Sequence, residues 1–198
     1  MGLKMFNASL IILAGGRGSR LGGVNKGLML FNNQCMIDRI LSRVQSEFDD
    51  IIVVTNTHLD EYRLRKNIRV ISDEYSDYRG PLAGIHAGLL DARHQCAFIL
   101  PCDAPGPIQE IFPELKKQMN LSLDLIIPHD GERLQPLFSL VHKNLLPGLQ
   151  IALADEQYKV SQFFLEQRHK VVSVPQLKPV FQNVNTPSDL DALSSVTF

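Results

Sequence analysis

The sequence contains little cysteine and no surplus of either charge. Its 198 residues include only three cysteines, Cys35, Cys96 and Cys102. An odd number without C-x-x-C spacing argues against a disulfide framework and a zinc site, so a reducing cytoplasm is the expected location. With 20 basic and 21 acidic residues, the net charge of −1 predicts neither a nucleic acid nor an anionic membrane as partner.

Long hydrophobic runs are also missing. No apolar stretch approaches the ~20 residues that cross a bilayer, and the segment after Lys4 lacks the apolar centre of a secretory signal. A soluble protein is therefore expected. Its length fits one domain, residues 1–198, in which a chain of this size buries roughly 70% of its unfolded surface.

Short apolar, β-branched runs alternate with stretches of helical periodicity. Strands are predicted over 10–14, 51–54, 69–71, 97–101, 125–127, 137–141, 171–174 and 181–184. Helices are predicted over 36–48, 59–66, from Pro81, over 107–119, 144–154 and 160–168. This order predicts an α/β fold: a doubly wound, mostly parallel sheet with helices on both faces, whose ligands bind beyond the carboxyl ends of the strands.

The glycine-rich segment 14–27 directly follows the first predicted strand. Glycines allow backbone N–H groups to converge on an anion, and basic residues add charge, so this loop predicts phosphate binding. It is not a Walker P-loop, because Lys26 lies between Asn25 and Gly27. A dinucleotide fingerprint is also disfavoured, because Leu21 stands at its third glycine position.

Two aspartates follow other predicted strands. Asp103 lies just past the strand that ends at Pro101, where one carboxylate beside a triphosphate suits Mg²⁺; the alternative is an N-cap for the helix from Pro107. Asp73 follows the third strand, where a carboxylate can accept the two N–H groups of guanine; the alternative is a simple turn cap.

The segments Leu13-Ala14-Gly15-Gly16, Arg20-Leu21-Gly22-Gly23 and Lys26-Gly27 resemble the signature loop of the nucleotidyltransferases, most closely that of the molybdenum cofactor guanylyltransferases. The resemblance extends to Gly80-Pro81-Leu82-Ala83-Gly84, Pro101-Cys102-Asp103 and Asn183-Val184-Asn185-Thr186-Pro187. One position departs from it: the family usually has Asp where this chain has Asn25, which keeps hydrogen-bonding capacity beside Lys26 but loses the negative charge.

The resemblance implies transfer of GMP from GTP to the terminal phosphate of molybdopterin or the bis-molybdopterin molybdenum cofactor, with Mg²⁺ and release of pyrophosphate. Molybdoenzyme chaperones are a further implied class of partner. The implied catalytic residues are Lys26, Asp103 and Arg20, with Asp103 on the metal. The implied GTP-binding residues are Leu13, Ala14, Gly15, Gly16, Lys26, Asp73, Gly80 and Asp103, and the implied pterin cleft contains Asn183, Asn185 and Lys159.

Two alternatives stay open. One is a cytidylyltransferase that acts on molybdopterin or on a sugar or polyol phosphate, although such relatives tend to have Ala-Ala-Gly where this chain has Ala14-Gly15-Gly16. The other is a GTP-binding module without catalysis, for which Asn25 is the only hint.

Overall fold

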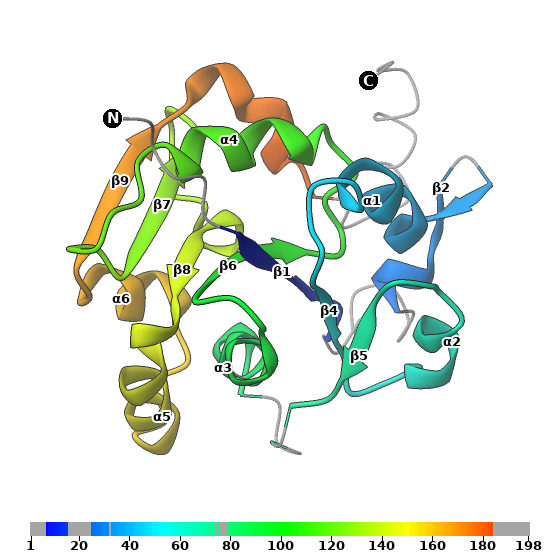
Figure 1. Cartoon of the computed structure of the whole chain (residues 1–198), viewed down its shortest axis with the longest axis horizontal. Helices are drawn as coiled ribbons and strands as arrows, with labels where there is room; N and C mark the ends of the chain where they lie inside the picture. The colour runs from blue at the N-terminus through cyan, green and yellow to red at the C-terminus, as the bar shows by residue number, and fades with distance from the viewer. Residues whose placement is uncertain (1–6, 16–24, 32, 74, 76–78, 184–198) are drawn as a thin grey trace.

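The computed structural model describes residues 7–15, 25–31, 33–73, 75 and 79–183. This part of the chain forms a seven-stranded sheet in the order β5-β4-β1-β6-β8-β7-β9 and a small hairpin of β2 and β3 (Figure 1). The large sheet contains β1 (Ala8–Leu13), β4 (Ile51–Val54), β5 (Arg69–Ile71), β6 (Cys96–Pro101), β7 (Leu125–His129), β8 (Leu140–His142) and β9 (His169–Ser173). The hairpin consists of β2 (Leu30–Phe31) and β3 (Gln34–Cys35).

The sheet is mostly parallel, as predicted. Strands β5, β4, β1 and β6 pair in parallel, and Ile12 of β1 lies opposite Val53 on one side and Leu100 on the other. Among the seven strands described for this sheet, β8 alone runs antiparallel to both of its neighbours, β6 and β7. The carboxyl ends of β1, β4, β5 and β6 therefore meet at one edge of the sheet.

Helices cover both faces of the sheet (Figure 1). The α-helices are α1 (Met36–Val44), α2 (Leu59–Arg63), α3 (Pro81–Asp91), α4 (Ile111–Lys116), α5 (Leu146–Ala154) and α6 (Val160–Leu165). The 3₁₀ helices are η2 (Lys26–Leu28), η3 (Ile108–Glu110), η4 (Pro136–Phe138), η5 (Lys143–Leu145) and η6 (Pro175–Phe181). Within the described ranges, no helix has the length and apolar character that crossing a membrane requires.

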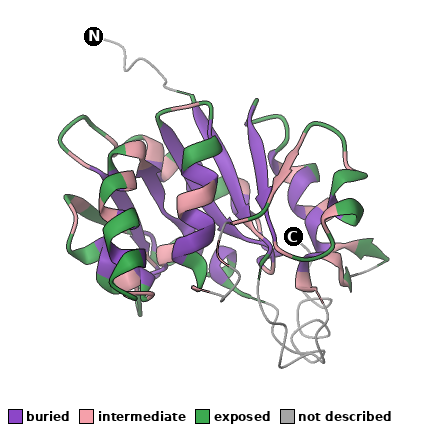
Figure 2. Ribbon diagram, turned by 90° about the horizontal axis from the view of Figure 1, so that it is seen from below, coloured by how far each residue is buried: buried purple, intermediate pink, exposed green. Residues whose placement is uncertain are grey.

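The two faces bury separate hydrophobic cores, because successive side chains of a strand point to opposite sides. Leu10 and Ile12 of β1 belong to the core with α1 and α4, whereas Ile11 belongs to the core with α3, α5 and α6. Figure 2 shows the resulting layers, with buried strands between helices whose outer sides are exposed. This double burial explains why the central strands β1, β4 and β6 consist mainly of buried apolar residues.

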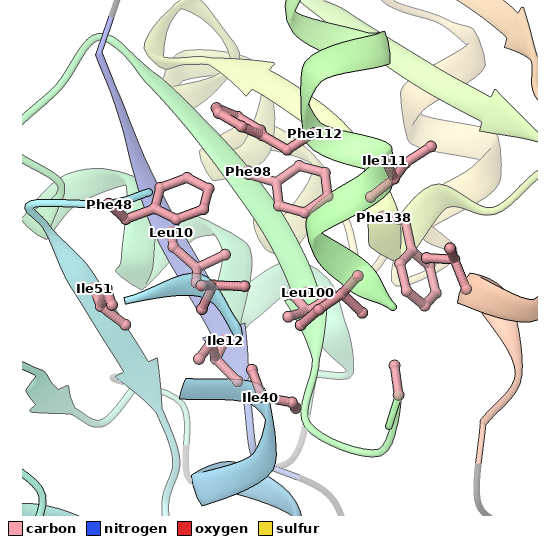
Figure 3. Close-up of a cluster of buried hydrophobic side chains, with 14 of the residues drawn as sticks. Leu10, Ile12, Ile40, Phe48, Ile51, Phe98, Leu100, Ile111, Phe112 and Phe138 are labelled. Atoms are coloured by element: carbon pink, nitrogen blue, oxygen red, sulfur yellow. The ribbon is translucent and has the colours of Figure 1, made fainter. Parts of the chain in front are cut away.

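Three phenylalanines form the centre of the core under α1 and α4 (Figure 3). The ring centroid of Phe112 lies 4.7 Å from that of Phe48 and 5.4 Å from that of Phe98. Phe98 is on β6, Phe112 is on α4, and Phe48 follows the end of α1. The cluster therefore joins a central strand to the helices that cover it.

One predicted strand starts later than expected, and another is not a strand over its described residues. Over 137–141, Pro136 starts η4, which extends through Phe138, and pairing begins only at Leu140. Over 181–183, the chain completes η6 and continues without regular structure, and residue 184 lies outside the described residues. Both 3₁₀ helices contain proline, which has no backbone N–H to donate to a neighbouring strand and therefore favours a helical turn there.

Several predicted helices have different bounds. The helices predicted over 36–48, 59–66 and 160–168 end earlier, at Val44, Arg63 and Leu165. Those predicted over 107–119 and 144–154 begin with the 3₁₀ turns η3 and η5 before α4 and α5. Apolar periodicity continues into the turns that flank a helix, which is why it locates ends poorly.

Phe98→Ala should lower the free energy of unfolding by about 3–5 kcal/mol, because the deletion leaves a cavity between a central strand and α4. Leu121→Ala is the matched control, since Leu121 is 98% exposed and its truncation should change stability by no more than about 0.5 kcal/mol. Urea denaturation of both variants measures the difference. Equal stability of the two variants would contradict the packing described here.

Candidate active site

A cavity of about 400 Å³ lies at the carboxyl ends of β1, β4, β5 and β6. Eight of the predicted site residues line it: Leu13, Ala14, Gly15, Lys26, Asp73, Gly80, Asp103 and Asn183. These residues come from six separate parts of the chain. The edge of the sheet where ligands were expected thus carries a hollow that contains most of the predicted residues.

Four predicted residues are not placed in this cavity. Gly16, Arg20 and Asn185 lie outside the described residues. Lys159 is the exposed residue before α6 and is not part of the cavity lining.

Lys26 and Asp103 meet in the cavity. Lys26 begins η2, Asp103 follows β6 by two residues, and Lys26 Nζ donates to Asp103 Oδ2 over 2.8 Å. The side chains are 27% and 13% exposed, respectively. The ion pair therefore joins the end of the glycine-rich loop to the strand-end carboxylate in a partly desolvated position, where charges interact more strongly than in water.

Hydrogen bonds between neighbouring strands fix the loops that follow them. The N–H of Ala14 donates to Val54 O over 2.9 Å, and that of Cys102 donates to Leu13 O over 3.1 Å. Burial, with the adjacent Asp103 charge, raises the pKa of the Cys102 thiol to about 12. Cys102 is therefore a protonated packing residue and not a nucleophile.

Two arginines of α1 hold the loop after Asp103. Arg43 donates to the carbonyls of Pro105 and Gly106, and Arg39 Nε donates to Pro105 O over 3.3 Å. The alternative that Asp103 caps the next helix is wrong, because η3 has Pro107 at its N-cap and no side-chain cap bond. Asp103 therefore lines the cavity and does not cap a helix.

Asp73 has a structural contact and also lines the cavity. Its Oδ1 accepts the N–H of Tyr75 over 3.1 Å, which is the turn bond of the simpler alternative. Its own N–H donates to Asn56 Oδ1, also over 3.1 Å. The turn leaves Asp73 facing the cavity, so the two interpretations are compatible.

Gly80 closes this side of the cavity. Its φ of 71° and ψ of −167° lie in a region that residues with a Cβ avoid, and Pro81 then starts α3. Gly80 therefore borders the cavity with its backbone, and a Cβ at this position would lie 3.7 Å from the carbonyl oxygen of Tyr158.

Sequence reasoning missed three polar residues of the lining: Asn56, Thr57 and Arg79. Asn56 and Thr57 follow β4 closely, so the rule that ligands bind beyond strand ends would have found them. Arg79 packs over the Tyr75 ring at 4.5 Å and donates to Leu153 O over 2.9 Å. Its position depends on α5, which no local pattern reveals.

The donor chemistry of the cavity suits a hard cation bound through phosphate. Asp103 supplies a carboxylate there, and among the residues with described positions no cluster of three or more His, Cys, Asp or Glu could form an all-protein cage. Mg²⁺ commonly uses one or two carboxylates together with substrate phosphates and water. The residues present fit that mode.

Beside the cavity, Asp130 shapes the turn that leads to the lining residue Leu137. Its Oδ1 accepts the N–H groups of Glu132 and Arg133, each over 2.8 Å, and its Oδ2 accepts the Gln135 amide over 2.6 Å. Burial alone would raise the pKa of this carboxyl, but these donors outweigh it and lower the pKa to about 2. The polar connection predicted between β7 and the next strand is thus an ordered turn.

An open, mostly parallel sheet with Gly15, a lysine and a strand-end carboxylate around one cavity is typical of nucleotide-binding α/β proteins. The model of the MobA-like NTP transferase domain matches residues 10–171. A molybdenum cofactor guanylyltransferase of Vibrio cholerae is 34% identical over 188 residues, covering 95% of this chain and 92% of the relative. One from Aliivibrio fischeri is 31% identical over 194 residues, covering 98% and 99%.

Solved structures support the same fold. Molybdopterin-guanine dinucleotide biosynthesis protein A from Archaeoglobus fulgidus superimposes with a TM-score of 0.74 at 23% identity, covering 93% of this chain and 95% of that one. A 4-diphosphocytidyl-2C-methyl-D-erythritol synthase from Anaerococcus prevotii has a TM-score of 0.71 at 16% identity, with 94% of both chains covered. The chain belongs to the MobA-like NTP transferases, and the predicted resemblance to molybdenum cofactor guanylyltransferases is confirmed.

The Asp130 turn should make stability depend on acid. A folded-state pKa below the usual ~3.9 contributes stability above about pH 4, and this contribution is lost as pH falls toward 2. Asp130→Asn should therefore unfold more easily than the wild type at pH 7, and the gap should shrink between about pH 4 and 2. Denaturant unfolding across this range measures it, with Asp155→Asn at an exposed position as the control. A gap that does not change with pH would contradict the assignment.

Proposed function

We propose that this chain transfers GMP from GTP to the terminal phosphate of molybdopterin, forming a molybdopterin guanine dinucleotide cofactor and pyrophosphate. The observation that carries the proposal is the Lys26–Asp103 pair inside the strand-end cavity. The choice of reaction is supported by relatives named molybdenum cofactor guanylyltransferase, which match nearly the full length of the chain. The bis-molybdopterin molybdenum cofactor is included as an acceptor.

In this reaction a phosphate oxygen of the pterin attacks the α-phosphorus of GTP. A new P–O bond forms, the bond from the α-phosphorus to the bridging oxygen breaks, and pyrophosphate leaves with that electron pair. The protein need not provide a nucleophile, because such transfers depend mainly on positioning and charge stabilisation. This agrees with the protonated Cys102 beside the site.

The proposed residue roles rest on the chemistry of each residue and, for Leu13, Ala14, Gly15 and Lys26, on its place in the cavity lining. Backbone N–H groups at Gly15 and Gly16, with Arg20, hold the β- and γ-phosphates. Lys26 stabilises the negative charge that develops around the α-phosphate. Leu13 and Ala14 contribute backbone at the end of β1, where the base and ribose enter the cavity.

Asp103 is the proposed ligand of Mg²⁺, which would supply positive charge that stabilises the triphosphate. Without nucleotide, Lys26 and Asp103 neutralise each other. With GTP bound, Lys26 would pair with phosphate and Asp103 would hold the cation, so neither charge would be left unpaired in this partly buried place. Before substrate binds, the ion pair keeps both side chains directed into the cavity.

Asp73 is proposed to select guanine. A carboxylate can accept both N–H groups of the guanine edge, whereas cytosine offers a different edge. The N–H that Asp73 donates to Asn56 anchors its backbone at the cavity wall. The fold does not choose between bases, because a cytidyl synthase shares it.

The remaining proposals concern the acceptor and the location. Asn183 lines the cavity, and with Asn185 and Lys159 it is proposed to face the pterin. Molybdoenzyme chaperones remain the proposed delivery partners. The three cysteines are all unpaired, which suits a cytoplasmic enzyme.

Purified protein with molybdopterin and Mg²⁺ should release pyrophosphate from GTP and not from CTP. Asp73→Asn keeps an oxygen for the Tyr75 N–H but replaces the other with a donor that repels guanine, so kcat/KM for GTP should fall about 10- to 100-fold. Asp60→Asn, whose side chain is 93% exposed, is the control. Faster turnover of CTP would establish the cytidylyltransferase alternative, and GTP binding without pyrophosphate release would establish the non-catalytic one.

Lys26→Ala and Asp103→Ala should each lower kcat at least about 100-fold, since loss of one preorganised charge contact costs ~2.7–4 kcal/mol of transition-state stabilisation. Lys117→Ala, at an exposed position after α4, should retain wild-type turnover. Pyrophosphate release is measured, with thermal unfolding to show that each variant folds. Wild-type rates in either site variant would remove that residue from the mechanism.

A further inference from the structure

A buried tyrosine outside the predicted site contacts the segment that carries Lys26. Tyr62 is on α2 and has no exposed surface. Its hydroxyl donates to Asn25 Oδ1 over 2.6 Å, across 37 positions of sequence. Burial raises the pKa of this phenol above its usual value, so the hydroxyl stays protonated and keeps its donor.

The Asn25 side chain also forms hydrogen bonds with Gly27, on the other side of Lys26, and with Thr57. Its Oδ1 also accepts the N–H of Gly27 over 3.1 Å, and its Nδ2 donates to Thr57 Oγ1 over 3.3 Å. Thr57 is itself fixed, because its carbonyl accepts from Thr55 Oγ1 over 2.8 Å at the end of β4. The residues before and after Lys26 are thus tied to β4 and α2.

Close packing adds to these hydrogen bonds. A Cβ placed on Gly27 would lie 2.2 Å from the Tyr62 hydroxyl and 3.4 Å from Cys102 Cβ, so only glycine lets η2 rest on the phenol. Met29 N–H closes η2 on the carbonyl of Lys26 over 3.2 Å. The backbone of η2, which carries Lys26, therefore packs against the Tyr62 side chain.

We propose that Tyr62 is a positioning residue: its hydroxyl, acting through the Asn25 amide, sets the place from which Lys26 reaches the reacting phosphate. Tyr62 does not line the cavity and has no contact with substrate in this role. The inference rests on the proposed function for its kinetic consequence. Its structural part, the order of η2, can be measured without any substrate.

The kinetic test is Tyr62→Phe, which removes one hydroxyl and keeps the buried ring. We expect kcat for pyrophosphate release to fall about three- to tenfold, where tenfold corresponds to ~1.4 kcal/mol. KM for GTP should change less than about twofold, because Lys26 acts on charge that grows in the transition state and the other phosphate contacts remain. Tyr158→Phe, which removes a phenol that is not part of the cavity lining, should match the wild type.

A double-mutant cycle separates positioning from general destabilisation. Asn25→Ala removes the group through which Tyr62 acts, so adding Tyr62→Phe to it should lower kcat by less than about twofold further. If the two losses multiply instead, Tyr62 does not act through Asn25 and the proposal is overturned.

Hydrogen exchange followed by mass spectrometry provides the readout that needs no activity. Tyr62→Phe should speed amide exchange in a peptide covering 26–29 by about three- to tenfold and leave peptides from β1 and β6 unchanged. Unchanged exchange at 26–29, or unchanged kcat, overturns the proposal. If the wild type releases no pyrophosphate from GTP, the proposed function fails on its own, and the exchange result still decides whether Tyr62 orders η2.

Discussion

The parallel pairing of β1 with β4 on one side and β6 on the other is the constraint on which the site depends. Parallel strands have their carboxyl ends at the same edge, so the loops after all three strands must open there. The backbone bonds from Ala14 to Val54 and from Cys102 to Leu13 extend this order past the last paired residues. Lys26 and Asp103 can meet only because two covered faces keep these strands buried and in register.

Bringing Lys26 and Asp103 together removes both charges partly from water, which costs free energy of desolvation. Removing charges from water is unfavourable unless each finds a partner, and at 27% and 13% exposure both are partly desolvated. Arg39 and Arg43 hold the carbonyls after Asp103, while Tyr62 and Asn25 hold the backbone around Lys26. The backbone on which each charge is carried is therefore held by contacts that nucleotide binding need not displace.

Local pattern predicted those parts of the fold whose cause is local. The runs at β4 and β5 have the predicted bounds because the four β-branched residues of β4, and Val70 and Ile71 of β5, pair with neighbouring strands. The strand-end positions of Asp73 and Asp103 follow from the same pattern together with sheet geometry. Pro136 begins η4, and Pro175 and Pro179 are part of η6. These 3₁₀ turns replace parts of the strands predicted over 137–141 and 181–184, because a pattern of apolar residues does not distinguish a turn from a strand.

The contacts that sequence reasoning missed are those between distant elements. Nothing near Tyr62 indicates that its hydroxyl lies under Gly27, because that contact requires α2 to pack against the end of the glycine-rich loop. The same contact bears on Asn25, which stands where the family usually has Asp. The amide oxygen accepts the Gly27 and Tyr62 donors, and neither bond requires a negative charge. An amide also donates to Thr57, so neutrality at this position is compatible with an ordered Lys26 and gives no reason to assign the chain to a non-catalytic class.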